Sequence, residues 1–211
     1  MNHRDNSEIF AFPDPDTCTS DGLIALGGDL KPERLILAYQ SGIFPWYTEE
    51  PIKWYSPDPR MVLFPGELHI PKSLAKVIKQ DKFEIKVDSD FRSVIKNCAL
   101  RRQGETWITE AMIESFIQLH EIGMAHSIEA YSNGKLAGGI YGMEAGDIFS
   151  GESMFFHQPN ASKAALIYLI HKLQVDGFIL LDCQVYTDNL ARFGARQIRR
   201  NKFLEILRKS I

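Results

Sequence analysis

Two polar side chains follow an apolar run near the C-terminal part of the chain. Residues 178–185 (FILLDCQV) are typical of a buried strand, and Asp182 and Gln184 come at its end. Alternate residues of a strand share a face, so this pair is expected on the face opposite to Cys183. A carboxylate in apolar surroundings must be hydrogen-bonded, paired or protonated. A lone Asp would be interpreted as a turn cap, but the pair indicates a site.

A second acid lies inside a predicted strand. Glu152 stands between Gly151 and Ser153 in the run DIFSGESMF. Glycine in a strand interior often marks the close approach of a ligand or of another backbone. A surface-facing Glu on an edge strand is an equal alternative, and the sequence leaves both open.

Three tryptophans lie near turns or predicted helix starts: Trp46, Trp54 and Trp107. Aromatic side chains in rigid loops suit stacking against nucleobases, which is worth about 1–3 kcal/mol per base. Core packing is the usual role of a tryptophan. We expect one or two of the three to stack on a base.

Basic residues are clustered, although the chain as a whole is not basic. With 24 Lys plus Arg against 27 Asp plus Glu, the formal charge is −3, which does not predict nucleic-acid binding. One cluster consists of Lys72, Lys76, Lys79, Lys82 and Lys86, and its first three lysines have helical spacing. A second consists of Arg192, Arg196, Arg199, Arg200 and Lys202, and its arginines suit phosphate groups. Solvated helix faces are the alternative for both clusters.

The composition excludes several classes of protein. Hydrophobic residues make up 45% and charged residues 24%, as in folded globular proteins. We found no run long enough to cross a bilayer and no signal peptide at the N-terminus. The three cysteines are far apart, which favours a reducing cytoplasm over a disulfide framework. The sequence also lacks metal-ligand spacing and phosphate-loop motifs, so we expect no metal and no cofactor.

The N-terminal third predicts little regular structure. Residues 1–31 are expected to form an irregular arm packed through Phe10 and Phe12, followed by a helix over 32–40. Residues 43–60 hold four prolines and five aromatics in eighteen positions. This proline density predicts a rigid loop and no central strand.

The remainder alternates between the two periodicities. Strands are expected at 61–64 and 83–87, and helices at 71–80, 90–102 and 110–122. From residue 125 the order is β-β-β-α-β-α-β, with a hairpin at Asn133-Gly134, a helix over 162–175 and a strand near 195–199. This order resembles the GNAT fold of acetyl-CoA N-acetyltransferases. However, the loop 157–162 has no glycine, and Pro159 lacks the N–H that could hold a pyrophosphate, so an acyl group is expected to arrive on another carrier.

Eight motifs in order resemble the leucyl/phenylalanyl-tRNA–protein transferase family of bacteria. They are GLIALGGDL (22–30), AYQSGIFPWY (38–47), WYSPDPRMVLFP (54–65), TWIT (106–109), GMAHSIEA (123–130), SGESMF (150–155), NASKAAL (160–166) and LLDCQV (180–185). The resemblance implies an α+β chain, with a small N-terminal α/β domain at 1–60 and a GNAT-like mixed-sheet acyltransferase domain at 61–211. It also implies transfer of leucine or phenylalanine from aminoacyl-tRNA to the N-terminal Arg or Lys of a protein, which marks that protein for degradation.

The resemblance implies a role for individual residues. Trp46 and Trp107 would lie against the 3′-terminal adenosine, and Asp182 would orient Gln184 so that the pair positions and helps deprotonate the attacking amine. Glu152 would hold the acceptor's basic terminus. The 2′-hydroxyl of the tRNA stays open as another source of the base.

The resemblance also implies a pocket for the transferred side chain, formed by Ile140, Phe149, Leu166 and Leu169. Ile140 stands where Met is familiar and Phe116 where Tyr is, which puts a hydrogen bond from position 116 in doubt and can shift the balance between Leu and Phe.

The resemblance further implies leucyl-tRNA and phenylalanyl-tRNA as partners, and we expect a cytoplasmic monomer. The acceptor stem is expected on Lys72, Lys76 and Lys79, with Arg192, Arg196, Arg199 and Arg200 as a second candidate surface. Two other functions remain open. One is an N-acetyltransferase that uses acetyl-CoA, favoured by the element order. The other is an RNA-binding module without catalysis.

Overall fold

The computed structural model describes residues 11–78, 80, 82–100 and 106–211. These residues form two sheets, several helices and the loops that connect them. The mixed α+β class expected from the sequence is confirmed.

A small antiparallel sheet contains β1 (Leu23–Leu26), β2 (Phe44–Pro45) and β3 (Lys53–Tyr55), with helix α1 (Pro32–Gln40) between β1 and β2 in the chain. The strand order is β1-β3-β2, so β3 is a central strand and the prediction of a loop without one is wrong. The prolines do not prevent it, because Pro51 and Pro57 lie on either side of β3 and Pro45 lies in the edge strand β2.

The N-terminal arm packs as expected where it is described. The ring of Phe12 meets Trp54 edge-on, with 4.9 Å between centroids, while Phe10 lies outside the described residues. A single-turn helix, η2 (Pro15–Thr17), and strand β1 add regular structure that was not predicted.

The large sheet has the order β10-β4-β9-β8-β7-β6-β5. Its strands are β4 (Arg60–Leu63), β5 (Glu84–Val87), β6 (Ala125–Ser132), β7 (Lys135–Ala145), β8 (Ile148–Phe156), β9 (Leu180–Gln184) and β10 (Arg196–Ile198). All described pairs are antiparallel except β8 with β9, which helix α5 (Ala161–Val175) connects by a crossover. The predicted hairpin is confirmed, since Asn133 and Gly134 both have the positive φ of a type I′ turn.

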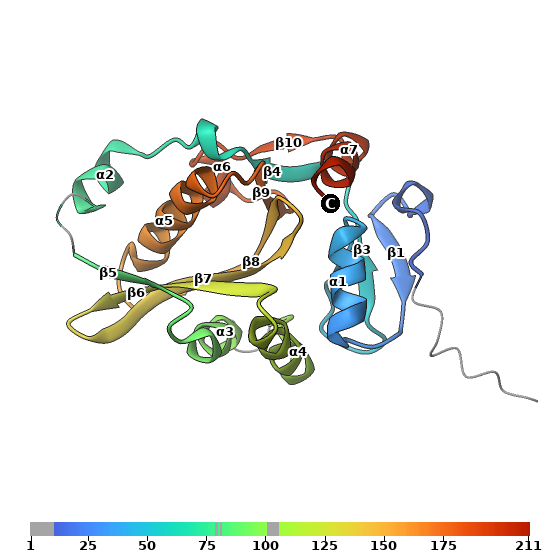
Figure 1. Ribbon diagram of the computed structural model, residues 1–211, viewed down its shortest axis with the longest axis horizontal. Helices are drawn as coiled ribbons and strands as arrows, with labels where there is room; N and C mark the ends of the chain where they lie inside the picture. The colour runs from blue at the N-terminus through green and yellow to red at the C-terminus, as the bar shows by residue number, and fades with distance from the viewer. Residues whose placement is uncertain (1–10, 79, 81, 101–105) are drawn as a thin grey trace, which may run out of the picture.

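Helices cover both faces of this sheet. Helix α5 packs on one face, and α3 (Phe91–Leu100) and α4 (Glu110–Glu121) pack on the other (Figure 1). Short helices, η3 (Pro65–Glu67), α2 (Lys72–Ile78) and α6 (Asp188–Ala191), lie in the connections, and α7 (Arg200–Ser210) ends the chain. The predicted helices are present with ends shifted by one or two residues, except where residues 79 and 101–102 lie outside the described chain. No helix in the described part of the chain is long and apolar enough to span a bilayer.

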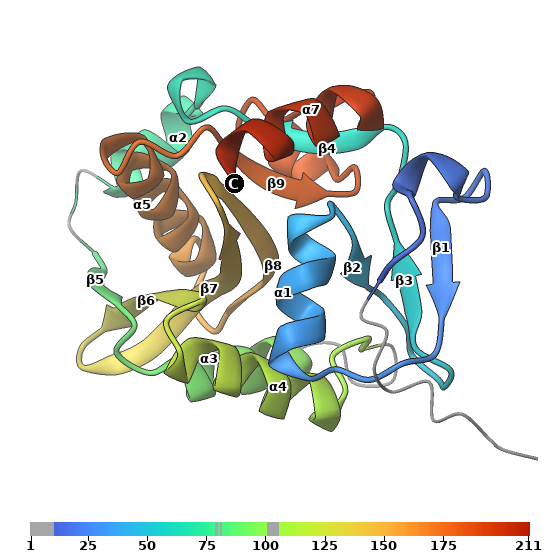
Figure 2. The same ribbon diagram turned by 45° about the vertical axis from the view of Figure 1, so that its right-hand side comes forward.

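Helix α1 joins the two sheets. It contacts β2 of the small sheet, β7 of the large sheet and α4, and Figure 2 shows it between them. One apolar core includes residues of both parts, among them Trp54 and Tyr141. The division at residues 60 and 61 stays a prediction, although β4 begins there and enters the large sheet.

Candidate active site

A cavity of about 540 Å³ opens where β8 and β9 separate. Their parallel pairing runs from Ile148 with Leu180 to Ser150 with Asp182, and the cavity lies at the Asp182 end of this pairing. Its lining includes residues 151–154 of β8 and residues 181–185, which span the end of β9 and the residue after it. It also includes Phe44 and Pro45 of β2 in the small sheet, and Trp46, which follows β2. The fold thereby brings together three motifs that are far apart in the sequence.

A bulge in β8 aims Glu152 into this cavity. In the pairing of β7 with β8, Tyr141 faces Ser153 and the next residue, Gly142, faces Gly151, so Glu152 is the extra residue. A bulge turns one side chain away from the normal alternation. Glycine is required at 142, since a Cβ there would lie 2.1 Å from the carbonyl oxygen of Ser150. Glu152 is 8% exposed in an interior strand, so the alternative of a surface-facing Glu on an edge strand is wrong.

A second irregularity sets the pair at the end of β9. Strand β4 pairs Met61 with Gln184 and Val62 with Asp182, which leaves Cys183 as the extra residue. Gln184 has a left-handed backbone with φ 62°, and its N–H donates to Asp182 Oδ1 at 2.9 Å. Asp182 therefore fixes the backbone of Gln184. Burial raises the pKa of the Cys183 thiol, which disfavours a thiolate nucleophile here.

Arg60 is the partner of Asp182, and the sequence analysis did not find it. Its guanidinium donates from Nε to Oδ1 at 2.8 Å and from Nη2 to Oδ2 at 2.6 Å, and both side chains are 1% exposed. The ring centroids of Phe44 and Phe203 lie 4.8 Å and 4.6 Å from the guanidinium carbon of Arg60. Ser150 Oγ donates to the same carboxylate at 3.3 Å. A carboxylate with all these donors is a structural anchor and has no lone pair directed at a substrate.

The carboxyl group of Glu152, unlike that of Asp182, is only partly hydrogen-bonded. Its Oε1 accepts hydrogen bonds from Tyr39 Oη at 2.6 Å and from Gln184 Nε2 at 2.7 Å. Its Oε2 is buried without a hydrogen-bond partner among the described residues. Burial, with repulsion from Asp182 as a smaller cause, raises the pKa of Glu152 from about 4.5 to about 8. A buried carboxyl with one unpartnered oxygen favours a cationic or proton-donating ligand.

The three tryptophans differ in exposure and in whether they reach the cavity. Trp46 is 44% exposed and Trp107 is 8% exposed, and both line the cavity. Trp54 is buried, and its indole N–H donates to the Gly27 carbonyl at 2.8 Å. Trp46 is held edge-on against Tyr55, with ring centroids 5.9 Å apart. The cavity thus presents two indoles that a planar base could contact.

The predicted apolar pocket is found only in part. Ile140 and Leu166 line the cavity with Leu181. Phe149 and Leu169 are buried in the core behind it and do not line it. Phe116 does not line it either. It packs edge-on against Tyr141 at 5.5 Å, in a position where a hydroxyl would be buried. These three residues are therefore core residues. The sequence does not separate them from pocket residues, because apolar residues of a core and of a pocket follow the same spacing.

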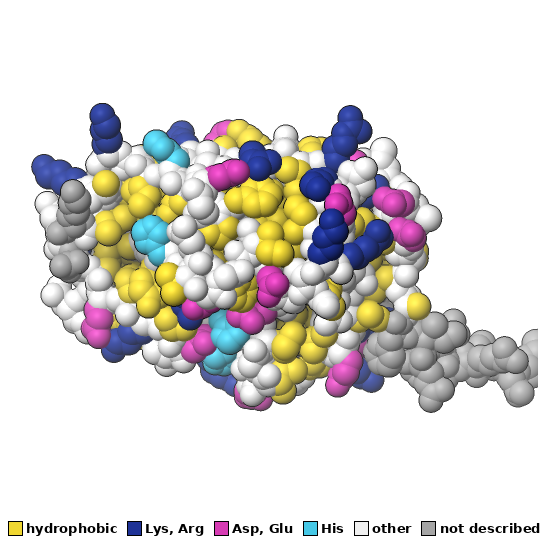
Figure 3. Space-filling view, turned by 45° about the horizontal axis from the view of Figure 1, so that its top comes forward, with side chains coloured by type: hydrophobic (Ala, Val, Ile, Leu, Met, Phe, Trp, Pro, Cys, Tyr) yellow, Lys and Arg dark blue, Asp and Glu magenta, His cyan; other side chains and the backbone are white. Residues whose placement is uncertain are grey.

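The basic clusters separate into different environments. Lys72 and Lys76 are exposed on α2, and Lys79 lies outside the described residues. Arg192 and Arg199 are exposed, whereas Arg196 pairs with Glu67 at 2.9 Å. Arg200 is 13% exposed and donates to the Ser56 carbonyl at 2.9 Å, so a contact to tRNA from it is not supported. Figure 3 shows Lys and Arg mainly toward the two ends of one face, with hydrophobic side chains between them.

The arrangement is suited to acyl transfer between two substrates. It offers indoles for a base, apolar side chains for a hydrophobic group and a carboxyl that can take a proton. In the part of the chain that is described, no group of three or more His, Cys, Asp or Glu is placed to hold a metal ion.

Comparisons with known proteins identify the family of this chain. The family model described as leucyl/phenylalanyl-tRNA protein transferase matches residues 62–208, and the model of its N-terminal domain matches residues 28–58. Curated proteins named leucyl/phenylalanyl-tRNA–protein transferase are similar over nearly the whole chain. The one from Anaeromyxobacter dehalogenans (strain 2CP-C) is 48% identical, over 95% of this chain and 88% of its own length. The one from Magnetococcus marinus is 48% identical, over 99% and 92%.

Among solved structures, a functionally unknown conserved protein from Staphylococcus epidermidis ATCC 12228 aligns with a TM-score of 0.46 and 8% identity, over 84% of this chain and 68% of that one. The match to both family models and the identity to the curated proteins settle the family. This chain belongs to the leucyl/phenylalanyl-tRNA–protein transferases.

Proposed function

We propose that this protein transfers leucine or phenylalanine from aminoacyl-tRNA to the N-terminal Arg or Lys of acceptor proteins, as a cytoplasmic monomer, and so marks them for degradation. The observation that carries the proposal is the cavity in which Trp46, Trp107, Gln184 and Glu152 meet, in a chain of this family. The aminoacyl ester is already activated, so the step needs neither ATP nor acetyl-CoA.

The donor end would lie between the indoles and the apolar wall. The terminal adenine stacks on Trp46 and Trp107, and the leucine or phenylalanine side chain lies against Ile140, Leu166 and Leu181, which line the same cavity. Shape in this wall would favour an unbranched Cβ, since one methyl group alone discriminates by only about 1–3 kcal/mol.

The acceptor's amine would be received by Glu152 and Gln184. The unpartnered Oε2 of Glu152 can accept a hydrogen bond from the α-ammonium group. Its pKa of about 8 lies close to the value of about 7.7–8.0 for an α-amino group. A proton therefore passes from the ammonium to the carboxylate at little cost, and the amine becomes a nucleophile.

The reaction then balances as follows. The amine nitrogen attacks the ester carbonyl, a C–N bond forms, and the C–O bond to the ribose breaks. Of the two protons that the ammonium loses, one returns through Glu152 to the leaving ribose oxygen and the other enters solvent. In this mechanism Asp182 does not take a proton. It holds Gln184 in place, and Arg60 holds Asp182. This replaces the expectation that the Asp182–Gln184 pair itself assists deprotonation.

The test is transfer of radiolabelled leucine from leucyl-tRNA to a peptide with N-terminal Arg. The same peptide with an acetylated N-terminus is the control, because it keeps the side chain and lacks the nucleophile. Label should enter the first peptide only. If the label stays on the tRNA with both peptides, the proposed transferase activity is refuted. Micromolar binding of acetyl-CoA, with acetylation of the peptide, would support an N-acetyltransferase instead.

A further inference from the structure

A second cavity, of about 310 Å³, lies between α2, the start of α5 and the end of α6. Its polar lining comes from Asn160, Lys163, Asn189 and Arg192, and Pro71 and Leu74 from the α2 segment form part of its apolar side. None of its lining residues is an acid. Asn189 also lines the active-site cavity, so the two cavities are neighbours.

The two cations in this cavity have no acidic partner among the described residues. Neither Lys163 nor Arg192 takes part in an ion pair there, in contrast to Arg196, which pairs with Glu67. Lys163 is half-buried and therefore held near the cavity. Two uncompensated cations in a concave site produce a positive potential that favours an anion.

The neutral groups in the lining also suit an anion. Asn160 is the N-cap residue that precedes α5. It has a left-handed backbone, φ 73°, and its side chain makes no capping hydrogen bond to the helix. Its amide can therefore donate to a ligand, as can the amide of Asn189. Amide and guanidinium N–H groups that converge with an ammonium group are the donors that phosphate oxygens accept from.

We propose that this second cavity binds a phosphodiester of the single-stranded 3′ end of the donor RNA, through Lys163 and Arg192. The proposal rests on the proposed function, since a 3′-terminal adenosine in the active-site cavity would be joined through its 5′ phosphate to the next nucleotide of the donor RNA, and the second cavity is the neighbour of the first. The proposal gives Lys163 of α5 a role in phosphate binding, which the sequence alone does not predict. Of the four arginines in the predicted second cluster, it selects Arg192, which alone among them lines this cavity.

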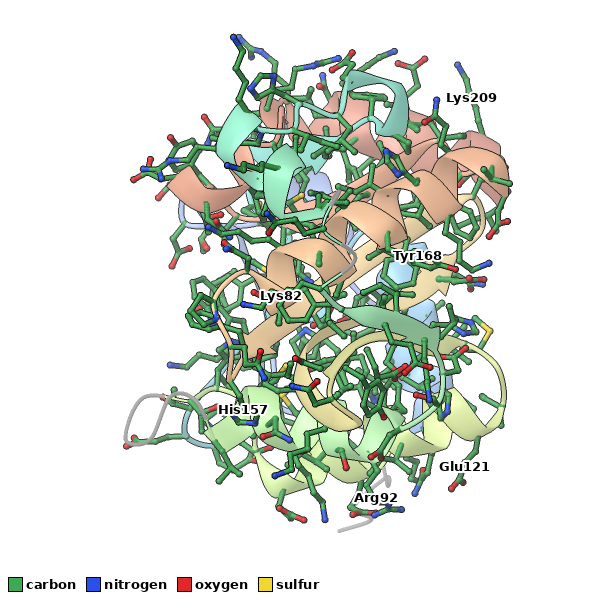
Figure 4. The ribbon with its side chains drawn as sticks, turned by 90° about the vertical axis from the view of Figure 1, so that its left-hand side faces the viewer. Lys82, Arg92, Glu121, His157, Tyr168 and Lys209 are labelled. Carbon is green, nitrogen blue, oxygen red and sulfur yellow. The ribbon has the colours of Figure 1, made fainter. Side chains whose placement is uncertain are left out.

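The test compares three donors: leucyl-tRNA, leucine esterified to the trinucleotide CCA, and leucine esterified to adenosine. The second keeps the phosphates of the 3′ end without the stem, and the third has no phosphate. Lys163→Ala and Arg192→Ala are the variants. Lys209→Ala and Arg92→Ala are the matched controls, at opposite ends of the view in Figure 4 and both exposed.

For each variant, the ratio of KM for leucyl-CCA to KM for leucyl-adenosine should rise about tenfold, the effect of losing one hydrogen bond to a charged group. The salt dependence of log KM for leucyl-CCA should fall by about 0.7 per lost contact. The control variants should leave the ratio unchanged. An unchanged ratio in Lys163→Ala and Arg192→Ala, or an equal rise in KM for all three donors, would overturn the proposal.

A measurement of RNA binding tests this proposal independently of the proposed function. Fluorescence anisotropy with labelled, uncharged CCA needs no transfer. Weaker binding to both variants at low salt, with Lys163→Arg restoring it, supports the phosphate site even if no leucine is transferred. Equal binding by the wild type and both variants would refute the site even if transfer is efficient.

Discussion

Replacing Glu152 with Gln should make the protein more stable and less active. The amide has nearly the shape of the carboxyl, and its oxygen can still accept from Tyr39 and Gln184, as Glu152 Oε1 does at 2.6 Å and 2.7 Å. The change therefore removes a buried charge without removing the two hydrogen bonds.

The size of the effect follows from the pKa of Glu152. The folded state holds its proton up to about pH 8, whereas the unfolded chain releases it near pH 4.5. Between these two values the folded state binds more protons than the unfolded state, so stability falls as pH rises. At about 1.36 kcal/mol per pH unit, this group costs at most about 5 kcal/mol above pH 8. Below pH 4.5 it costs nothing, because both states are protonated.

The assay is urea unfolding of wild type and Glu152→Gln at pH 5, 7 and 9. The difference in the free energy of unfolding should be small at pH 5 and should increase in favour of the variant to several kcal/mol at pH 9. Glu33→Gln, at an exposed position on α1, is the control for loss of a negative charge. A difference that does not change with pH, or one that decreases, would refute this account of Glu152.

Three further variants test the anchor, the stacking surface and the bulge. Arg60→Met leaves the buried Asp182 carboxylate without its cation and should cost about 3–5 kcal/mol of stability in urea unfolding, and a loss under 1 kcal/mol would contradict the anchor. Trp46→Ala should raise KM for leucyl-tRNA at least fivefold, as loss of about 1 kcal/mol or more of stacking implies, with the melting temperature nearly unchanged because the ring is half-exposed; an unchanged KM would remove Trp46 from the donor site. Gly142→Ala places a Cβ against the carbonyl of Ser150, so it should lower both thermal stability and transfer, and full activity would show that the bulge is dispensable.

Local signals in the sequence predicted most of the elements. The turn residues Asn133 and Gly134 fixed the hairpin of β6 and β7, and apolar periodicity indicated α4 and α5. Proline density over the whole segment 43–60 does not predict the small sheet, because its central strand needs only three residues free of proline, Lys53–Tyr55.

The site needed information that no local pattern contains. Arg60 and Asp182 are 122 positions apart, and a lone arginine before an apolar strand has no spacing that names its partner. One signal was present, since an arginine next to the run MVLF must be paired if it is buried. The bulge at Glu152 and the left-handed Gln184 depend on strand register, so simple alternation misplaces the residues that follow them. Val185 shows this, because it packs with Leu180 in one core although alternation assigned it to the face of Cys183.

The pH dependence of kcat/KM for leucine transfer to an Arg-terminated peptide tests the central claim most directly. If Glu152 takes the proton of the acceptor's ammonium, the wild-type profile is bell-shaped with its maximum near pH 8, where one proton is shared between the two groups. Glu152→Gln should then be much slower and should show only a rise with deprotonation of the amine. The same bell at similar rates in both proteins would contradict the mechanism.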